Sequence, residues 1–137
     1  MLLRRIIFGL ILAFTLPAMQ VGAVDLENII YLELKDGRVT IELRPDLAPN
    51  HVARIKELVR EKFYDGIVFH RVIEDFMAQT GDPTGTGSGG SGQHLEAEFS
   101  KEKHLRGALS MARAADPNSA DSQFFIVFKT APWLDGQ

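Results

Sequence analysis

The sequence has 137 residues, 45% of them hydrophobic and 9% aromatic, which suits one domain with a substantial apolar core. The formal net charge is −3, so charge indicates neither a nucleic acid nor an anionic surface as a partner. The sequence has no cysteine, which excludes disulfide bonds.

The first residues, 1–23, have the layout of a secretory signal peptide. A basic start is followed by an apolar run over residues 6–16 and by small residues at 21–23. The alternative is an uncleaved membrane anchor, but the apolar run is about half of the ~20 residues that a spanning helix needs. We therefore expect cleavage after Ala23, which leaves residues 24–137 as a single domain in the periplasm.

The first half of the mature chain predicts a hairpin and a helix. Residues 28–34 and 38–43 alternate apolar and polar side chains, and Asp36-Gly37 between them is a strong hairpin signal. Residues 46–60 predict a helix, with Pro49 in its first turn. The apolar positions at helical spacing are Val52, Ile55, Leu58 and Val59.

The second half predicts short strands separated by turns and a long glycine-rich loop at residues 81–92. Hairpins, short strands and one early helix favour a mainly β fold, an antiparallel β-barrel. The predicted strands are 67–73, 76–79, 95–99 (an edge strand), 108–112 and 123–128.

One arginine, Arg71, stands among large apolar residues, with Gln79 at the far end of the same stretch. A guanidinium directed into an apolar, water-poor pocket suits a reaction that needs no nucleophile and no proton transfer. The cis–trans isomerisation of the bond before proline is such a reaction. The alternative is a surface strand arginine, and the neighbouring Phe69, Phe76 and Met77 argue against it.

Several motifs, in order, resemble the cyclophilin-type peptidyl-prolyl isomerases of bacteria. The resemblance runs from about Asn28 to the last residue and implies a closed antiparallel barrel capped by two helices. The motifs are residues 69–73 (Phe-His-Arg-Val-Ile), 76–79 (Phe-Met-Ala-Gln), 109–114 (Leu-Ser-Met-Ala-Arg-Ala), 122–126 (Ser-Gln-Phe-Phe-Ile) and 133–136 (Trp-Leu-Asp-Gly).

The resemblance also implies a set of site residues. Arg71 is the implied catalytic donor to the proline nitrogen, and the apolar socket for the proline ring consists of Phe76, Met77, Phe125 and Leu134. Strand alternation directs Phe124 and Phe125 to opposite faces, and the resemblance assigns Phe125 to the cleft. The remaining implied substrate-binding residues are Gln79, Gly87, Ala112, Arg113, Ala114, Gln123 and Trp133.

The sequence departs from the family pattern at three places. Arg113 stands where many members have asparagine, and Glu74-Asp75 stands where the family often has Pro-Gly, so two carboxylates could compete for the charge of Arg71. Family members usually continue past the position of Gln137 with the closing strand, the second helix and a histidine or tyrosine of the proline pocket. We therefore expect that the barrel is not closed, that the strand at 28–34 has an unpaired edge, and that the helix face near Val52 lacks cover.

Two other patterns carry less weight. Residues 87–92 match G-x-G-x-x-G but lack the preceding buried strand and following helix of a dinucleotide site. The four histidines lack metal-ligand spacing, so no metal or cofactor is expected.

The resulting hypothesis is a monomeric isomerase of X–Pro bonds in unfolded or exported polypeptides. Its expected partners are proline-containing polypeptides and cyclosporin-type inhibitors, which the match at Trp133 suggests. No nucleic acid is expected, nor a membrane after cleavage. The alternatives are a proline-peptide-binding chaperone with weak or no turnover and a non-functional fragment.

Overall fold

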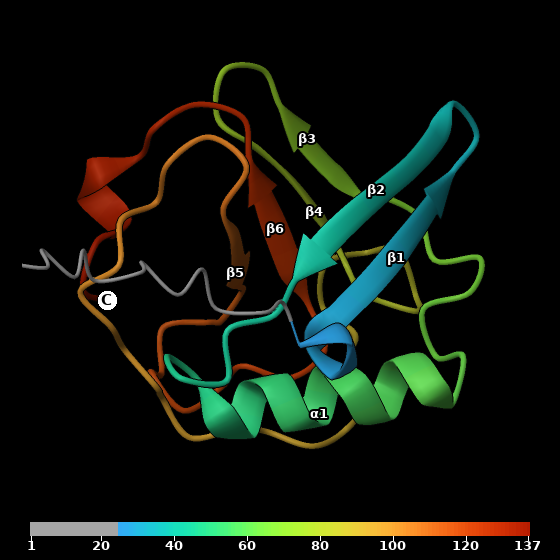
Figure 1. Ribbon diagram of the computed structural model, residues 1–137, viewed down its shortest axis with the longest axis horizontal. Helices are drawn as coiled ribbons and strands as arrows, with labels where there is room; N and C mark the ends of the chain where they lie inside the picture. The colour runs from blue at the N-terminus through green and yellow to red at the C-terminus, as the bar shows by residue number, and fades with distance from the viewer. Residues whose placement is uncertain (1–24) are drawn as a thin grey trace, which may run out of the picture.

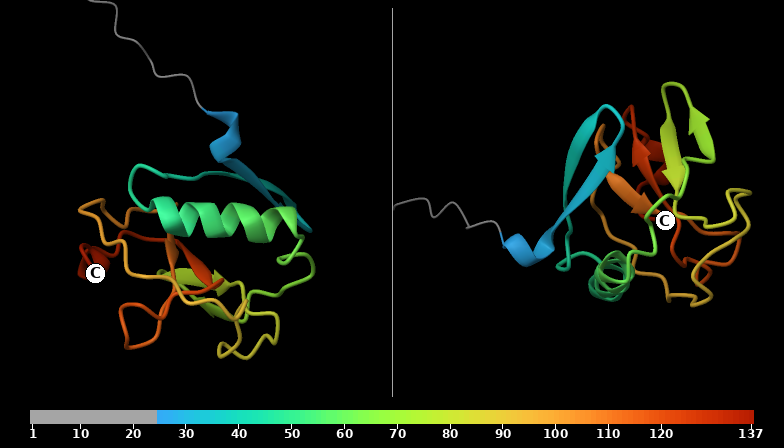
Figure 2. Two further views of the ribbon diagram at one scale, coloured as in Figure 1. Left: turned by 90° about the horizontal axis from the view of Figure 1, so that it is seen from below. Right: turned by 90° about the vertical axis from the view of Figure 1, so that its right-hand side faces the viewer.

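The computed structural model describes residues 25–137, so the expected signal peptide lies outside the described part of the chain. Two antiparallel sheets and one α-helix make up the fold, and the helix runs across the end of both sheets (Figures 1 and 2). The elements in order are η1 (Leu26–Asn28), β1 (Ile29–Leu34), β2 (Gly37–Glu42), α1 (Pro49–Arg60), β3 (Arg71–Ile73), β4 (Met77–Thr80), β5 (Leu109–Met111), β6 (Phe124–Val127) and η2 (Pro132–Leu134). The mainly β, antiparallel fold class predicted from the sequence is confirmed.

The first sheet is the predicted hairpin, β1 and β2. Leu34 pairs with Gly37 across a two-residue turn, and Gly37 has a φ of 141°, a conformation that side chains other than hydrogen rarely permit. Ile30 and Ile41 pair on the face that packs on the core. Within residues 25–137, β1 pairs with β2 alone, so its outer edge has no strand partner, as expected.

The helix begins three residues later than predicted, at Pro49, and a distant carboxylate caps its first turn. Ala48 offers no side-chain cap. Instead, Glu98 accepts hydrogen bonds from the backbone N–H groups of Asn50 (3.1 Å) and His51 (3.0 Å). Burial alone would raise the pKa of Glu98, but these hydrogen bonds outweigh it and hold that pKa below its usual range.

The apolar face of α1 is covered, contrary to the expectation for its Val52 end. Val52 and Ile55 are 8% and 3% exposed and share a cluster with Leu43 and Phe124, although they also line a cavity of about 520 Å³ between α1, β2 and β5. Val59 was expected on this face, but it points outward and is 36% exposed. None of the helices in residues 25–137 has the length and apolar character needed to cross a membrane.

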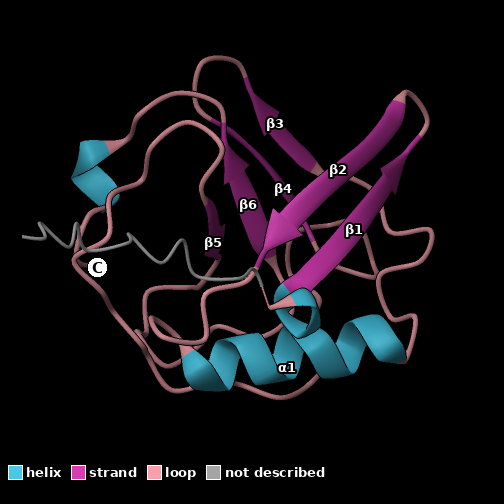
Figure 3. Cartoon of the chain, viewed as in Figure 1, coloured by secondary structure: helices cyan, strands magenta, loops and turns pink. Residues whose placement is uncertain are grey.

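The second sheet has the strand order β3-β4-β6-β5. Its strands are shorter than predicted, and much of the chain between β4 and β6 is loop (Figure 3). The expected strand at 67–73 is reduced to Arg71–Ile73, and before it the Val68 carbonyl accepts a hydrogen bond from the hydroxyl of Thr80 (3.0 Å) instead of from a backbone N–H. The expected strand at 95–99 is reduced to a single bridge between Leu95 and Ala120.

Candidate active site

A groove of about 310 Å³ lies on the four-stranded sheet and collects most of the predicted site residues. Those that line it are Arg71, Phe76, Met77, Gln79, Ala112, Arg113, Phe125 and Leu134. Gly87, Ala114, Gln123 and Trp133 do not line it. The groove therefore brings together residues from β3, β4 and β6 and from the segments that follow β5 and β6.

The floor of the groove is apolar because neighbouring strands present alternate side chains to it. Phe124 is buried in the core at 5% exposure, while Phe125, next along β6, lines the groove, as strand alternation predicts. Met77 is 2% exposed, and Phe76 packs against Trp133 with ring centroids 5.7 Å apart. These side chains can hold a small apolar ring and exclude water from one side of it.

Arg71 lies at the rim of this groove rather than inside it. Its side chain is exposed, which corrects the expectation of a guanidinium in a water-poor pocket. Arg71 on β3 pairs across the sheet with Gln79 on β4, and its Nη1 donates a hydrogen bond to Gln79 Oε1 (3.3 Å). The guanidinium therefore has a defined neighbour and keeps other N–H groups available to a ligand.

Two amide side chains connect Arg71 to the glycine-rich loop. Gln123 Nε2 donates to the carbonyls of Gly87 (3.0 Å) and Gly89 (2.7 Å). Its Oε1 consequently faces Gln79 and accepts a hydrogen bond from Gln79 Nε2 (2.8 Å). In this orientation Gln79 directs its Oε1 toward Arg71 and accepts the hydrogen bond from the guanidinium. Gln123 and Gly87 thus influence the groove through Gln79 rather than by lining it.

The glycine-rich loop is held by two carboxylates. Asp82 is 1% exposed and accepts hydrogen bonds from the backbone N–H groups of Thr84 (2.7 Å) and Gly87 (2.6 Å). Burial would raise the pKa of Asp82, but the Thr84 and glycine N–H bonds outweigh it and hold that pKa well below its usual range. Asp121 accepts from Ser91 and Gly92 in the same way.

The glycines in this loop let the chain pass close to the two carboxylates. A Cβ on Gly90 would stand 2.8 Å from the Asp121 carboxyl carbon. Beyond Gly92, the first helical element in the described chain is the short η2, so the G-x-G-x-x-G match has no helix to receive a dinucleotide phosphate.

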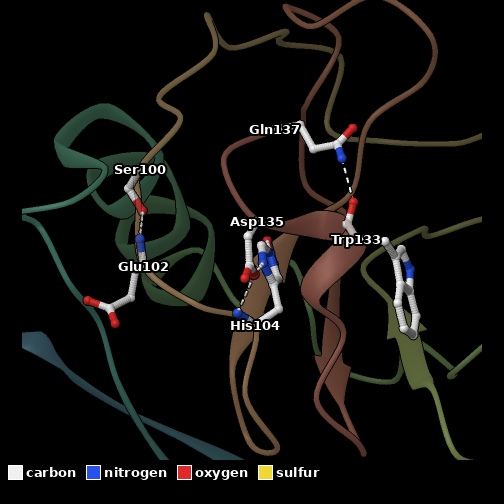
Figure 4. Close-up of polar contacts among 7 residues, drawn as sticks. Ser100, Glu102, His104, Trp133, Asp135 and Gln137 are labelled. Atoms are coloured by element: carbon white, nitrogen blue, oxygen red, sulfur yellow. Dashed lines mark hydrogen bonds and ion pairs between the residues drawn. The ribbon is translucent and has the colours of Figure 1, made fainter.

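Sequence reasoning missed four residues of the groove, among them His104. The His104 ring stacks on Phe125, with centroids 6.3 Å apart and planes 11° apart. Its Nδ1 contacts Asp135 Oδ1 at 3.1 Å (Figure 4), and its Nε2 contacts Ser110 Oγ at 3.1 Å. Metal-ligand spacing is the only local pattern that a histidine offers here, and a stacking contact with Phe125, 21 residues further along the chain, leaves no local signal. The missed lining residues are His104, Ser110, Met111 and Gln137.

The hydrogen bonds of His104 define its tautomer. An ionised carboxylate only accepts, so Nδ1 carries the proton that faces Asp135, and a neutral ring then accepts the Ser110 hydroxyl at Nε2. The backbone N–H of His104 also donates to Asp135 (2.9 Å) and is the main cause of the lowered pKa of that carboxyl group. Phe125 thus rests on a ring that is held from both sides.

The remaining predicted residues lie around the groove. Trp133 is 59% exposed on η2, and its carbonyl accepts a hydrogen bond from Gln137 (Figure 4). The Ala114 N–H donates to Ser119 Oγ (2.8 Å), so this N–H is not free to bind a substrate carbonyl. Asp75 lies 3.8 Å from Lys129 Nζ, and in the described chain neither Glu74 nor Asp75 forms an ion pair with Arg71.

These features define a class of site: an open apolar groove with a guanidinium at its rim, oriented by amides, on an antiparallel sheet. Residues 29–137 match the family described as "Cyclophilin type peptidyl-prolyl cis-trans isomerase/CLD". The chain belongs to the cyclophilin-type peptidyl-prolyl cis-trans isomerase family, and it is an isomerase of X–Pro peptide bonds.

Relatives and solved structures agree with this assignment. The chain is 54% identical to the "Probable peptidyl-prolyl cis-trans isomerase" of Brucella suis biovar 1 (strain 1330), over 91% of this chain and 70% of the relative. It is 47% identical to "Peptidyl-prolyl cis-trans isomerase B" of Bacillus subtilis (strain 168), over 77% and 76%. A cyclophilin-type isomerase of Cryptosporidium parvum, crystallised in the presence of the dipeptide Ala-Pro, is 35% identical with a TM-score of 0.75, over 79% and 72%.

Proposed function

We propose that the groove accelerates rotation of X–Pro bonds in unfolded or exported polypeptides and so assists their folding. The observation that carries this proposal is the placement of Arg71 at the rim of an apolar socket, where it donates to Gln79, which Gln123 orients. The Cryptosporidium relative crystallised with Ala-Pro supports a proline-containing segment as the ligand of this groove.

The mechanism follows from the electronic structure of the amide. Rotation has a barrier of about 18–20 kcal/mol because the nitrogen lone pair is delocalised into the carbonyl. In the twisted state the proline nitrogen becomes pyramidal and can accept a hydrogen bond, which we assign to the Arg71 guanidinium. Phe76, Met77 and Phe125 hold the proline ring while the preceding carbonyl turns. Both effects favour the twisted state over the planar one, which is the condition for a faster rate.

An isomerase assay that includes a refolding substrate tests this proposal. The purified protein should accelerate cis–trans exchange in a proline tetrapeptide, and also the slow refolding of a protein limited by a proline bond, which otherwise takes tens of seconds or longer. Binding of the peptide without acceleration would favour the chaperone alternative. Acceleration of the tetrapeptide but not of refolding would overturn the polypeptide substrate and leave the peptide chemistry in place.

We also propose that the protein is exported and works in the periplasm after cleavage behind Ala23. The basic start, short apolar run and small residues of 1–23 support this. Expressed with its own leader, the protein should be recovered from the periplasm with Val24 as its first residue, as intact mass will show. A Leu10→Arg control should block export by interrupting the apolar run. An intact mass that retains Met1, found in the membrane fraction, would favour an anchor.

The finer partner assignments are proposals as well. Trp133, exposed beside Phe76 at the edge of the groove, supports a site for cyclosporin-type inhibitors. We propose that the mature protein is a monomer that binds neither nucleic acid nor a membrane, as its small negative net charge favours.

A further inference from the structure

The ionisable residues that line the groove are all basic. Its lining contains Arg71, His104 and Arg113 but no aspartate or glutamate, although the whole sequence has more acidic than basic residues. The larger cavity beside α1 shares Arg113 and His104 with the groove and differs in its carboxylates, since Glu42, Glu98 and Glu102 also line it. The groove is therefore a local region without carboxylates, and a ligand that carries one meets no like charge in its lining.

The guanidinium of Arg113 is held in place by hydrogen bonds, and some of its N–H donors remain free. Its Nη1 donates to the carbonyls of Ala114 (2.9 Å) and Ala115 (3.3 Å), and its Cζ lies 5.7 Å from the centre of the Phe99 ring. Within residues 25–137, no acidic side chain forms an ion pair with it. Both of its hydrogen bonds there are made by Nη1, so Nη2 and Nε are free to donate. A positioned cation with free donors can receive a carboxylate at a small entropic cost.

The main chain at Arg113 can also pair with a peptide. Ala112 N–H donates to the Gln123 carbonyl (2.9 Å), which continues the sheet to this point. In the described chain the backbone N–H and C=O of Arg113 itself make no hydrogen bond. An extended substrate running along this segment would therefore place its side chains near the Arg113 guanidinium.

The strand order gives the distance from the reaction centre. Arg71 lies on β3 and Arg113 follows β5, and these strands are the opposite edges of the sheet (Figure 1). Arg71 is in register with Ser110 on β5, and Arg113 lies three residues beyond Ser110. Three strand spacings of about 4.8 Å across the sheet and three residues of about 3.3 Å along it separate Arg71 from Arg113 by roughly 17 Å, or about five residues of an extended peptide. Allowing for the lengths of both side chains, Arg113 reaches residues two or three positions from a proline held at Arg71.

We propose that Arg113 is a specificity-determining residue that favours substrates with a carboxylate two or three residues from the proline. This inference rests on the isomerase function proposed for the same groove and adds a substrate class to it. The ligand is an acidic proline-containing polypeptide segment, and the recognition is electrostatic.

The test compares acetylated and amidated peptides that contain one proline, with Glu or Gln placed in turn at each of the three positions on either side. Neutral ends matter because a succinyl cap would itself supply a carboxylate. Exchange rates are measured by NMR without a coupled protease. We expect kcat/KM to be about two- to five-fold higher for Glu than for Gln at a position two or three residues away, the range of an exposed ion pair. The preference should vanish in 1 M salt, where the screening length is about 3 Å.

Three variants assign the preference to Arg113. Arg113→Gln should bring the Glu-to-Gln ratio close to one, and Arg113→Glu should invert it. Arg106→Gln is the matched control, because Arg106 is also exposed and also donates Nη1 to a carbonyl, that of Phe128 (2.7 Å), but does not line the groove. This control should keep the parent ratio.

The outcomes distinguish failure of the proposed role of Arg113 from failure of the proposed isomerase function. Catalysis of every peptide with equal Glu and Gln rates, or a preference that survives Arg113→Gln, overturns the role of Arg113 and leaves the isomerase function standing. Failure to accelerate any of the peptides would instead count against the proposed function of the groove.

Discussion

Arg71→Ala should lower kcat/KM for a proline tetrapeptide by about 10²–10³, the loss seen when one donor to a developing transition-state charge is removed. The alanine variant lacks the group that we assign to the proline nitrogen, while the apolar socket of Phe76, Met77 and Phe125 remains. Peptide affinity should therefore fall much less than the rate. NMR exchange rates at saturating peptide, together with a titration of peptide binding, separate the two quantities.

Arg71→Lys should also be slow, because an ammonium on a mobile stem cannot take the place of a planar fork held by Gln79. The matched control is Arg38→Ala, which removes an exposed strand arginine from β2, where its guanidinium pairs with Glu33 far from the groove. Since both arginines are exposed, neither change should disturb the core. A parent rate in Arg71→Ala would show that the mechanism proposed here is wrong.

Local patterns predicted the parts of this fold that depend on neighbours in sequence. Asp36-Gly37 located the hairpin, and the alternation of Phe124 and Phe125 placed one ring in the core and the other in the groove. The resemblance supplied Arg71 and Gln79, and the register of β3 and β4 shows why these two residues meet.

Contacts between distant segments could not be predicted in this way. The cap on α1 comes from Glu98, nearly fifty residues beyond the helix start, and it satisfies N–H groups of a helix that begins at Pro49 rather than at residue 46. His104 joins the groove through Asp135, which follows it by 31 residues. A sequence pattern describes one element at a time, whereas these hydrogen bonds depend on how the loops return to the sheet.

Gly81→Ala should destabilise the protein more than Gly92→Ala, a change at another glycine of the loop with a positive φ. Gly81 follows β4 directly, has a φ of 91°, and lies against the main chain of the segment that leads into β6. A Cβ there would collide with the Ser122 carbonyl oxygen and stand 2.8 Å from the Gln123 Cα. Ser122 is fully buried and its hydroxyl donates to the Gly81 carbonyl (2.7 Å), so neither backbone can move aside without losing this bond.

Gly92→Ala separates the cost of the backbone conformation from the cost of the collision. Gly92 has a similar φ of 85°, but a Cβ on it would meet nothing within 4 Å. It should lose only the conformational part, about 1–2 kcal/mol of the free energy of unfolding. Gly81→Ala should lose about 2–5 kcal/mol, since the collision adds to the strain. Urea unfolding of both variants, with the slope of free energy on urea concentration checked for constancy, measures the difference.

The same collision should alter the hydrogen bonds that position Arg71 in the active site. Separating Gly81 from Ser122 displaces Gln123, and with it the hydrogen bond from Gln79 that leaves the Gln79 oxygen facing Arg71. Gly81→Ala should therefore lose isomerase activity even below its unfolding temperature, while Gly92→Ala keeps most of it. Equal losses of stability in the two variants would mean that the chain at 122–123 yields to the added methyl group. The contact between β4 and β6 would then not be what holds Gln79 and Gln123 in register.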